Sequence, residues 1–266
     1  MKNFTRIIKT VVVSLFAATA FSTYADPVAA TATTNAPPKW TGAASAGLTI
    51  TRGNSKTTLA TVVAAVDRKT DKDEWNFGGN VTYGTAQTTA NGVKTDSTTA
   101  QNADLFGQYN RFLLTDRLKD RFYIFGRADG YHDDLASIHY RLTLSLGPGY
   151  YFIKNTNTDL SAELGPGFIN QSVGSDEETY AIMRAAEKFN QKLSDRARLW
   201  EKAEIDPDLG NISNYIITSE IGVAADLTAS KTLELQCYLD DNYNNRPAPG
   251  RVCNDLQLVM AIGYKF

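Results

Sequence analysis

The chain has 266 residues, and 27 lysines and arginines against 29 aspartates and glutamates give a formal net charge of -2. This near-neutral balance provides no electrostatic footprint for nucleic acid, so no nucleic-acid partner is expected. A mean hydropathy of -0.30 argues against a helical membrane protein by composition.

Residues 1–25 have the features of a signal peptide. The segment opens with the basic residues Lys2, Arg6 and Lys9. An apolar centre over 11–21 follows, and it is too short to span a bilayer, which requires about 20 residues. The small-x-Ala pattern that ends at Ala25 predicts cleavage there, with Asp26 as the mature N-terminus.

Residues 26–39 are rich in proline, alanine and threonine. This composition predicts a disordered lead-in, because it offers too little apolar surface to bury. An exported protein enters a compartment that permits disulfides.

From residue 40 to residue 266 the dominant signal is an alternation of apolar and polar residues, which is the periodicity of a β-strand. For example, Leu142, Leu144 and Leu146 share one face of a strand. Arg141 and Thr143 lie on the other face. Such runs predict about twelve strands, near residues 40–52, 57–69, 73–88, 97–113, 121–133, 138–152, 158–171, 178–192, 198–206, 213–228, 231–243 and 252–266.

The links between these strands alternate in character. One set is short and polar, as in KNTN and TASK, and the other is more irregular, as in VGSDEE and NNRPAPG. The first link, GNSK, is a short exception to the second set. This alternation is typical of a barrel with one rim of tight turns and one rim of looser loops.

Alternating strands also fit a soluble sandwich or barrel, in which the apolar face points inward. Charges on the polar faces, and strands long enough to cross a membrane at a tilt, which needs roughly 9–11 residues, favour an outer-membrane barrel with a polar lumen. Closure also removes the unpaired strand edges that hydrocarbon does not tolerate. We therefore predict an all-β fold, a transmembrane antiparallel up-and-down β-barrel in the outer membrane of a Gram-negative bacterium, in contact with its lipids and lipopolysaccharide.

The last twelve residues, DLQLVMAIGYKF, alternate up to the C-terminus. A final strand that pairs with the first to close a barrel can run to the last residue. Tyr264 and Phe266 resemble the aromatic C-terminal signal that the outer-membrane assembly machinery reads. The alternative is the ordinary terminal strand of a secreted sandwich.

The segment SAGLTITRGNSKTTLATVVAAV resembles the YdiY-like putative salt-induced outer-membrane proteins, a family classed as a domain of unknown function. SLGPGYYF, ELGPGF, KFNQKLSDRARLWEKAE and the ending GYKF are similar to that family too. The resemblance covers roughly residues 40–266. It implies an outer-membrane barrel and a link to salt or osmotic stress, but it supplies no catalytic residues and no cofactor.

Charged residues of both signs fall on the polar faces of the predicted strands. The predicted lumen-lining set is Asp104, Arg127, Asp129, Arg141, Glu163, Arg184, Lys202, Glu204, Glu220, Glu234 and Lys265. Eight strands are filled by side chains and 16–18 leave an aqueous channel, so twelve lie between these cases. Paired charges would plug the bore, whereas partly unpaired charges would line a small, weakly selective pore.

A hydrolase would need a nucleophile beside an oriented histidine. The chain has two histidines, His132 and His139, which flank the link that contains Ser137. No GxSxG sequence is present. A solvated loop with two histidines is the simpler interpretation, and an envelope-lipid hydrolase that uses this region is the alternative.

Cys237 and Cys253 form an even pair in an oxidising compartment. If the last hairpin turns near Arg246, antiparallel pairing places them roughly opposite each other. A structural disulfide and two free thiols both remain open.

Two further patterns have structural interpretations. Acidic clusters such as Asp240–Asp241 supply the oxygen ligands that Ca²⁺ prefers, but no D-x-D-x-D-G loop is present, so no dedicated metal site is predicted. The tetrapeptide LGPG occurs at 146–149 and 164–167. Proline within a strand marks a bulge or bend, so we expect paired bends that curve the wall, with a widened lumen as the alternative.

The sequence therefore predicts a non-enzymatic envelope barrel that is either a narrow channel or a structural protein. A loop-mediated adhesin is disfavoured, because the predicted loops are short and polar. No solute, oligomeric state or stress signal is indicated.

Overall fold

A computed structural model describes residues 40–51, 55–90, 93–113 and 121–266, and every regular element in these ranges is a strand. The strands are β1 (Trp40–Thr51), β2 (Ser55–Lys69), β3 (Asp73–Ala90), β4 (Val93–Phe112), β5 (Phe122–Asp133), β6 (Ile138–Lys154), β7 (Thr158–Val173), β8 (Asp176–Lys192), β9 (Ala197–Pro207), β10 (Tyr215–Asp226), β11 (Leu233–Asn244) and β12 (Asn254–Lys265). No helix among these residues is long and apolar enough to cross a membrane.

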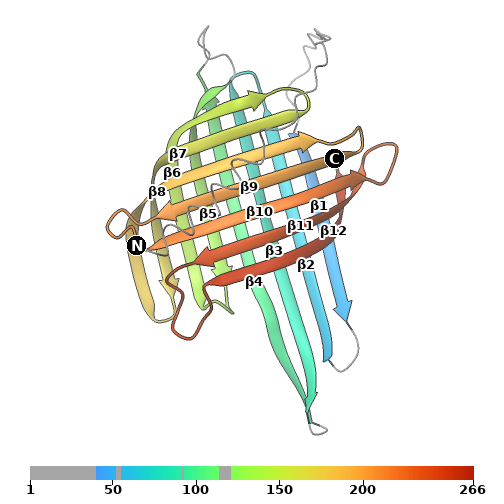
Figure 1. Ribbon diagram of the computed structural model, residues 1–266, viewed down its shortest axis with the longest axis vertical. Coiled ribbons are helices and arrows are strands. Elements are labelled where there is room, and N and C mark those ends of the chain that lie inside the picture. Colours follow the sequence, from blue (N-terminus) through green and yellow to red (C-terminus); the bar gives the residue numbers. More distant parts are fainter. Residues whose placement is uncertain (1–39, 52–54, 91–92, 114–120) are drawn as a thin grey trace. The chain divides into compact units, whose positions relative to one another are not determined.

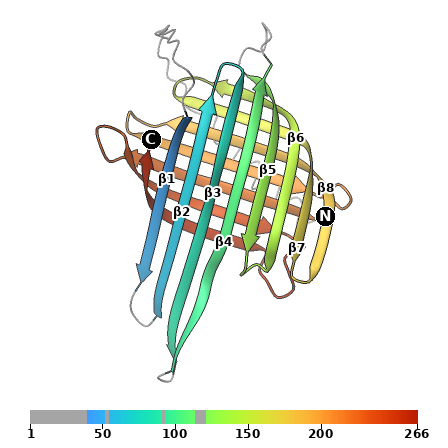
Figure 2. The same cartoon turned by 180° about the vertical axis from the view of Figure 1, so that it is seen from behind.

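The twelve strands close into one barrel. Each strand pairs antiparallel with its neighbours in the sequence, and β1 pairs with β12. Figure 1 shows β9–β12 crossing in front of β2–β5, and Figure 2 shows the opposite wall from behind. The predicted all-β, antiparallel up-and-down barrel of twelve strands is confirmed.

The barrel is apolar outside and polar inside. In β6, for example, Leu142, Leu144 and Leu146 are exposed on the outer face. The alternate residues of the strand point inward and are buried, including Arg141 and Thr143. A soluble barrel would show the reverse, so this arrangement is that of a barrel whose outer face contacts lipid.

Aromatic side chains on the outer face gather near the two rims. On the rim that carries both ends of the barrel, Trp75 and Tyr109 lie 4.5 Å apart between ring centroids. On the opposite rim, Tyr215 and Tyr243 stack at 5.9 Å. Aromatic girdles of this kind mark the two membrane–water interfaces.

The C-terminus closes the barrel against β1. Four residues of β1, Ala43–Ala46, pair with Ile262–Lys265 of β12. Two backbone hydrogen bonds between Gly42 and Phe266, of 3.0 and 2.9 Å, extend this pairing to the last residue. A Cβ on Gly42 would lie 2.5 Å from the Phe266 ring, so a larger residue there would have to displace this ring. The predicted pairing of the final strand with the first is therefore present.

The second rim does not consist of looser loops throughout, contrary to our expectation. The link between β7 and β8 consists of only Gly174 and Ser175 and is therefore shorter than expected. Gly174 adopts a φ of 62°, which permits this tight turn. Strands β3 and β4 continue far along their hairpin, with 18 and 20 residues, and extend beyond the neighbouring strands. This hairpin is longer than the membrane requires.

The two LGPG segments lie side by side in β6 and β7. A Cβ on Gly147 would lie 2.2 Å from the Leu164 carbonyl oxygen, and a Cβ on Gly165 would lie 2.0 Å from the Leu146 carbonyl oxygen. The backbones therefore approach more closely than any side chain allows. Pro148 interrupts the hydrogen-bond ladder here because it has no N–H group.

The last hairpin does not bring the two cysteines together, and both thiols are free. In the β11–β12 ladder Cys237 lies opposite Met260. The backbone oxygen of Cys253 instead accepts a hydrogen bond from the backbone N–H of Asn244, which lies seven residues beyond Cys237 in the chain. Seven residues of a strand span about 23 Å, and a disulfide requires Cα atoms within about 7 Å. The hairpin turns beyond Arg246, which makes the disulfide alternative wrong.

Some predictions fall on residues that the structure does not describe. These are the signal peptide over 1–25, the cleavage site between Ala25 and Asp26, the lead-in over 26–39 and the link within 114–120.

Candidate functional site: the charged barrel interior

A buried ion cluster lies inside the barrel on the wall formed by β4–β9. Its centre is Glu163 of β7, with a side chain that is 2% exposed, and Arg184 of β8, with a side chain that is 1% exposed. Nη1 of Arg184 lies 2.8 Å from Oε2 of Glu163. Nε of Arg184 donates to Oε2 of Glu204 at 2.9 Å. One guanidinium thus bridges two carboxylates, which is the geometry of strong, charge-assisted bonds.

Three further residues, from β4, β5 and β8, surround Glu163. Gln108 of β4 donates to Oε1 of Glu163 at 2.7 Å, and the Tyr123 hydroxyl of β5 donates to the same oxygen at 2.9 Å. Nζ of Lys188 lies 3.7 Å from that oxygen and donates to Gln108 at 3.1 Å. We call these six residues, including Arg184 and Glu204, the Glu163 cluster. Contacts from β4 to β8 run through the interior and brace this part of the wall.

Arg184 also contacts an aromatic ring near the LGPG segments. Gly165 is the partner of Arg184 in the β7–β8 ladder, and Gly147 is the partner of Phe125 in the β5–β6 ladder. The central carbon of the Arg184 guanidinium lies 5.2 Å from the centroid of the Phe125 ring, a cation–π geometry.

A second group of charges is much more open to water. Nζ of Lys202 on β9 lies 2.8 Å from Oε1 of Glu220 on β10, and the Lys202 side chain is 54% exposed although it points inward from the middle of its strand. Arg198 lies 2.9 Å from Glu234, and Lys265 lies 3.2 Å from the same carboxylate. Because Lys202 is exposed inside the bore, the charged side chains do not fill the interior.

The remaining predicted lumen residues also point inward. Nδ2 of Asn80 donates to Asp104 at 2.6 Å. Nε of Arg127 donates to Asp129 at 2.9 Å, within one strand. Arg141 is buried, and its Nε donates to Gln171 at 2.7 Å. The two residues of each pair lie on the same strand or on neighbouring strands, so none of these hydrogen bonds crosses the bore.

The wall opposite the Glu163 cluster is lined by smaller side chains. On β1, β2 and β3 the inward positions include Ser45, Thr61, Gly78 and Thr82, all of them buried. These short side chains contrast with the long charged side chains that β7, β8 and β9 direct inward.

The region of the two histidines forms no nucleophile–base pair. The Ser137 hydroxyl accepts a bond from Nε of Arg251 at 3.0 Å. Nδ1 of His132 lies 2.8 Å from the His139 backbone oxygen, and its Nε2 lies 3.4 Å from Asp134. No bond between Ser137 and His139 occurs in this described loop. Across the described ranges, no group of three or more His, Cys, Asp or Glu side chains is placed to hold a metal ion.

Gln108, Tyr123 and Lys188 are the members of the Glu163 cluster that the sequence did not single out. Their inward position follows from strand alternation, because Gln108 and Tyr123 lie among buried residues of β4 and β5. Their role depends on contacts between strands that are distant in the sequence, which no pattern within one strand encodes.

A family model described as a protein of unknown function, DUF481, matches residues 44–266. The chain belongs to the DUF481 family. The match covers strands β1–β12 almost completely. No curated protein matches the chain.

Solved structures with similar folds are outer-membrane barrels at low identity. The translocator domain of the autotransporter NalP from Neisseria meningitidis is 14% identical, covers 100% of this chain and 95% of that one, and has a TM-score of 0.47. The COG4313 outer membrane channel from Pseudomonas putida F1 is 11% identical, with 91% and 100% coverage and a TM-score of 0.47. The channel DcaP of Acinetobacter baumannii is 7% identical, with 86% and 96% coverage and a TM-score of 0.39. Such distant likenesses carry no conclusion about the activity of this member of the DUF481 family.

Proposed function

We propose that this DUF481 protein is a narrow, non-enzymatic channel for small ions and solutes in the outer membrane of a Gram-negative bacterium. Membrane-spanning β-barrels with an apolar outer band and a polar interior are typical of that membrane. The leader over 1–25 would direct export, with cleavage between Ala25 and Asp26. Tyr264 and Phe266 would be read by the barrel assembly machinery, and outer-membrane lipids and lipopolysaccharide would surround the wall.

The inward-facing but exposed Lys202 is the observation that carries the channel proposal. It lies in the middle of β9, so water-accessible volume reaches the centre of the bore. The Glu163 cluster supports the wall on one side of this volume. Lys202, Glu220 and Arg198 supply charges of both signs along it, which predicts a small conductance with weak ion selectivity.

Single-channel recording in planar bilayers tests this proposal. The refolded protein is expected to open reproducibly in KCl, and Lys202→Glu is expected to shift the reversal potential in a KCl gradient toward that of potassium. Lys202→Arg keeps the charge and serves as the matched control, so it is expected to retain the original reversal potential. A folded, heat-modifiable barrel without openings would contradict the channel and favour a structural role.

The link to salt or osmotic stress rests on the resemblance to the YdiY-like proteins. No described residue of the barrel interior supports this link. Transcript levels measured before and after a salt step would test it, and unchanged levels would remove the link without affecting the channel.

A further inference from the structure

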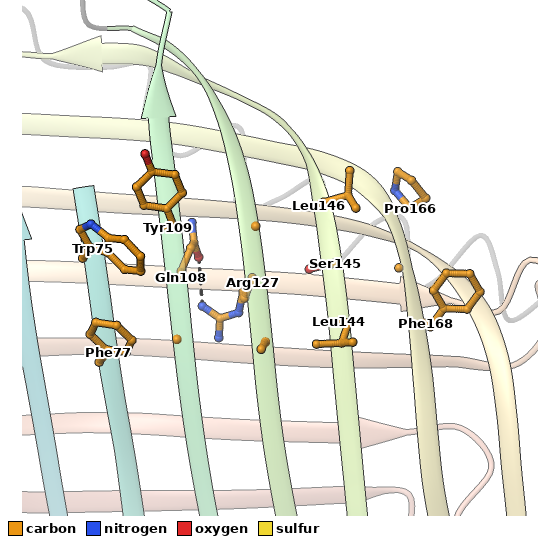
Figure 3. Close-up of a pocket in the computed structure, with 14 residues that line it drawn as sticks. Trp75, Phe77, Gln108, Tyr109, Arg127, Leu144, Ser145, Leu146, Pro166 and Phe168 are labelled. Carbon is orange, nitrogen blue, oxygen red and sulfur yellow. Dashed lines mark hydrogen bonds between the residues drawn. The ribbon is translucent and has the colours of Figure 1, made fainter. Parts of the chain in front are cut away.

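An open groove of about 640 Å³ lies on the outer wall of the barrel, across β3–β7 (Figure 3). Its floor consists of Gly107, Gly126 and Ala128 on β4 and β5. Trp75 and Phe77 of β3 form one side. Leu144, Leu146 and Phe168 of β6 and β7 form the other side, as Figure 3 shows.

The floor is open at Gly126, whereas the Phe77 ring lies against Gly107. A Cβ placed on Gly126 would have no atom within 4 Å. Tyr109, its partner in the β4–β5 ladder, leans toward Trp75, with 4.5 Å between ring centroids. Trp75 in turn stacks with Phe77 at 5.9 Å. The aromatic residues thus form a ridge beside the glycine instead of covering it.

Positive charge stands at the rim end of the groove. Arg111 follows Tyr109 on the same outward row of β4, and its side chain is 51% exposed. Its Nη1 lies 3.3 Å from Asp73, and a guanidinium has further N–H groups that can bind a phosphate. Arg121, which precedes β5, donates to the Phe152 carbonyl oxygen at 3.2 Å at the same rim. Arginine beside interfacial aromatics suits an anionic lipid headgroup.

We propose that the groove binds one acyl chain of an anionic glycerophospholipid, with its phosphate beside Arg111 and Arg121. The apolar ridges match an acyl chain, and the volume lies within the range of about 300–1,000 Å³ typical of ligand sites. The lipid belongs to the leaflet at the rim that carries Trp40 and Phe266. The inference rests on the membrane location proposed above but not on conduction.

Fluorescence quenching of Trp75 tests this site directly. Trp75 is 36% exposed in the groove, whereas Trp200 is buried in the interior. Trp40 is removed by Trp40→Phe, so that Trp75 becomes the lipid-accessible fluorophore. The protein is reconstituted in phosphatidylcholine vesicles that contain a small, fixed fraction of acyl-brominated phosphatidylglycerol or of acyl-brominated phosphatidylcholine. We expect about fivefold enrichment of the anionic lipid at Trp75, corresponding to about 1 kcal/mol for an arginine at the membrane surface.

Two variants separate the groove from the rim charge. Gly126→Leu fills the floor and is expected to abolish the excess quenching by brominated phosphatidylglycerol. Ala225→Leu places the same leucine side chain on the outer face of β10 and is the matched control, which is expected to keep the excess. Arg111→Gln is expected to reduce the excess quenching by brominated phosphatidylglycerol, because only Arg121 then remains beside the phosphate.

Equal quenching by both lipids in the Trp40→Phe protein would overturn the proposal, as would an excess that survives Gly126→Leu. Quenching by neither lipid, together with cross-linked dimers, would overturn it in favour of an interface between two copies. A barrel that shows the excess but conducts no ions would retain the lipid site and lose the channel.

Discussion

Replacing Glu163 by alanine tests whether the interior cluster is dry and braces the wall. The substitution removes a carboxylate that is 2% exposed and that accepts bonds from β4, β5 and β8. Arg184, at 1% exposure, would then keep only Glu204 among its described carboxylate partners. The Tyr123 hydroxyl would lose its acceptor. The unfolding free energy of the barrel should therefore fall.

The expected loss follows from the burial of both charges. Removing one partner of a buried ion pair costs about 3–5 kcal/mol, because the remaining charge is left uncompensated. Lys202→Ala is the internal comparison, since that ion pair is solvent-exposed within the same barrel. Exposed pairs contribute about 0–1 kcal/mol. The Glu163 variant is thus expected to lose several times more stability than the Lys202 variant.

Urea unfolding of the barrel in lipid vesicles measures both losses. The folded fraction can be read from tryptophan fluorescence and from heat-modifiable mobility on gels. Combining Glu163→Ala with Arg184→Ala should show a coupling of about 0.5–3 kcal/mol, the range for residues in direct contact. If Glu163→Ala costs no more than Lys202→Ala, the cluster is hydrated and the reasoning from burial is wrong.

Three further outcomes are expected. Gly165→Ala should lower the refolding yield, because its Cβ would lie 2.0 Å from a backbone oxygen of β6. The cost of this clash should exceed the usual overpacking cost of about 1–3 kcal/mol. A normal yield on refolding gels would contradict the close approach of the two strands. Gly42→Leu should impair closure of the barrel, since the new side chain would occupy the place of the Phe266 ring, and unchanged heat-modifiable mobility would refute this. Cys237 and Cys253 should both react with maleimide after unfolding without reductant, and a reductant-dependent mobility shift of the monomer would indicate a bridge instead.

Strand alternation was sufficient to separate the two faces of the wall. Glu163 and Arg184 were both placed on the inner face from alternation alone, because successive side chains of a strand point to opposite sides. The twelve strands and the closing role of the C-terminus could be predicted for the same reason. The salt link and the signal peptide remain predictions.

Pairing across the bore could not be predicted from the sequence. Gln108 and Glu163 are 55 residues apart in the chain and meet only because the barrel curves β4 toward β7. The cysteine alternative failed for a related reason. Cys237 pairs with Met260 because the actual turn is displaced from Arg246, and a small displacement moves every pair of a hairpin.

The sequence by itself determined the class of fold, the number of strands and which side chains face the interior, because these depend on a period of two within each strand. The tertiary structure alone decided which interior charges are buried together, where water reaches Lys202 and where the outer wall is hollow at Gly126. These features depend on strand register, tilt and curvature, which arise only when all twelve strands close around one interior.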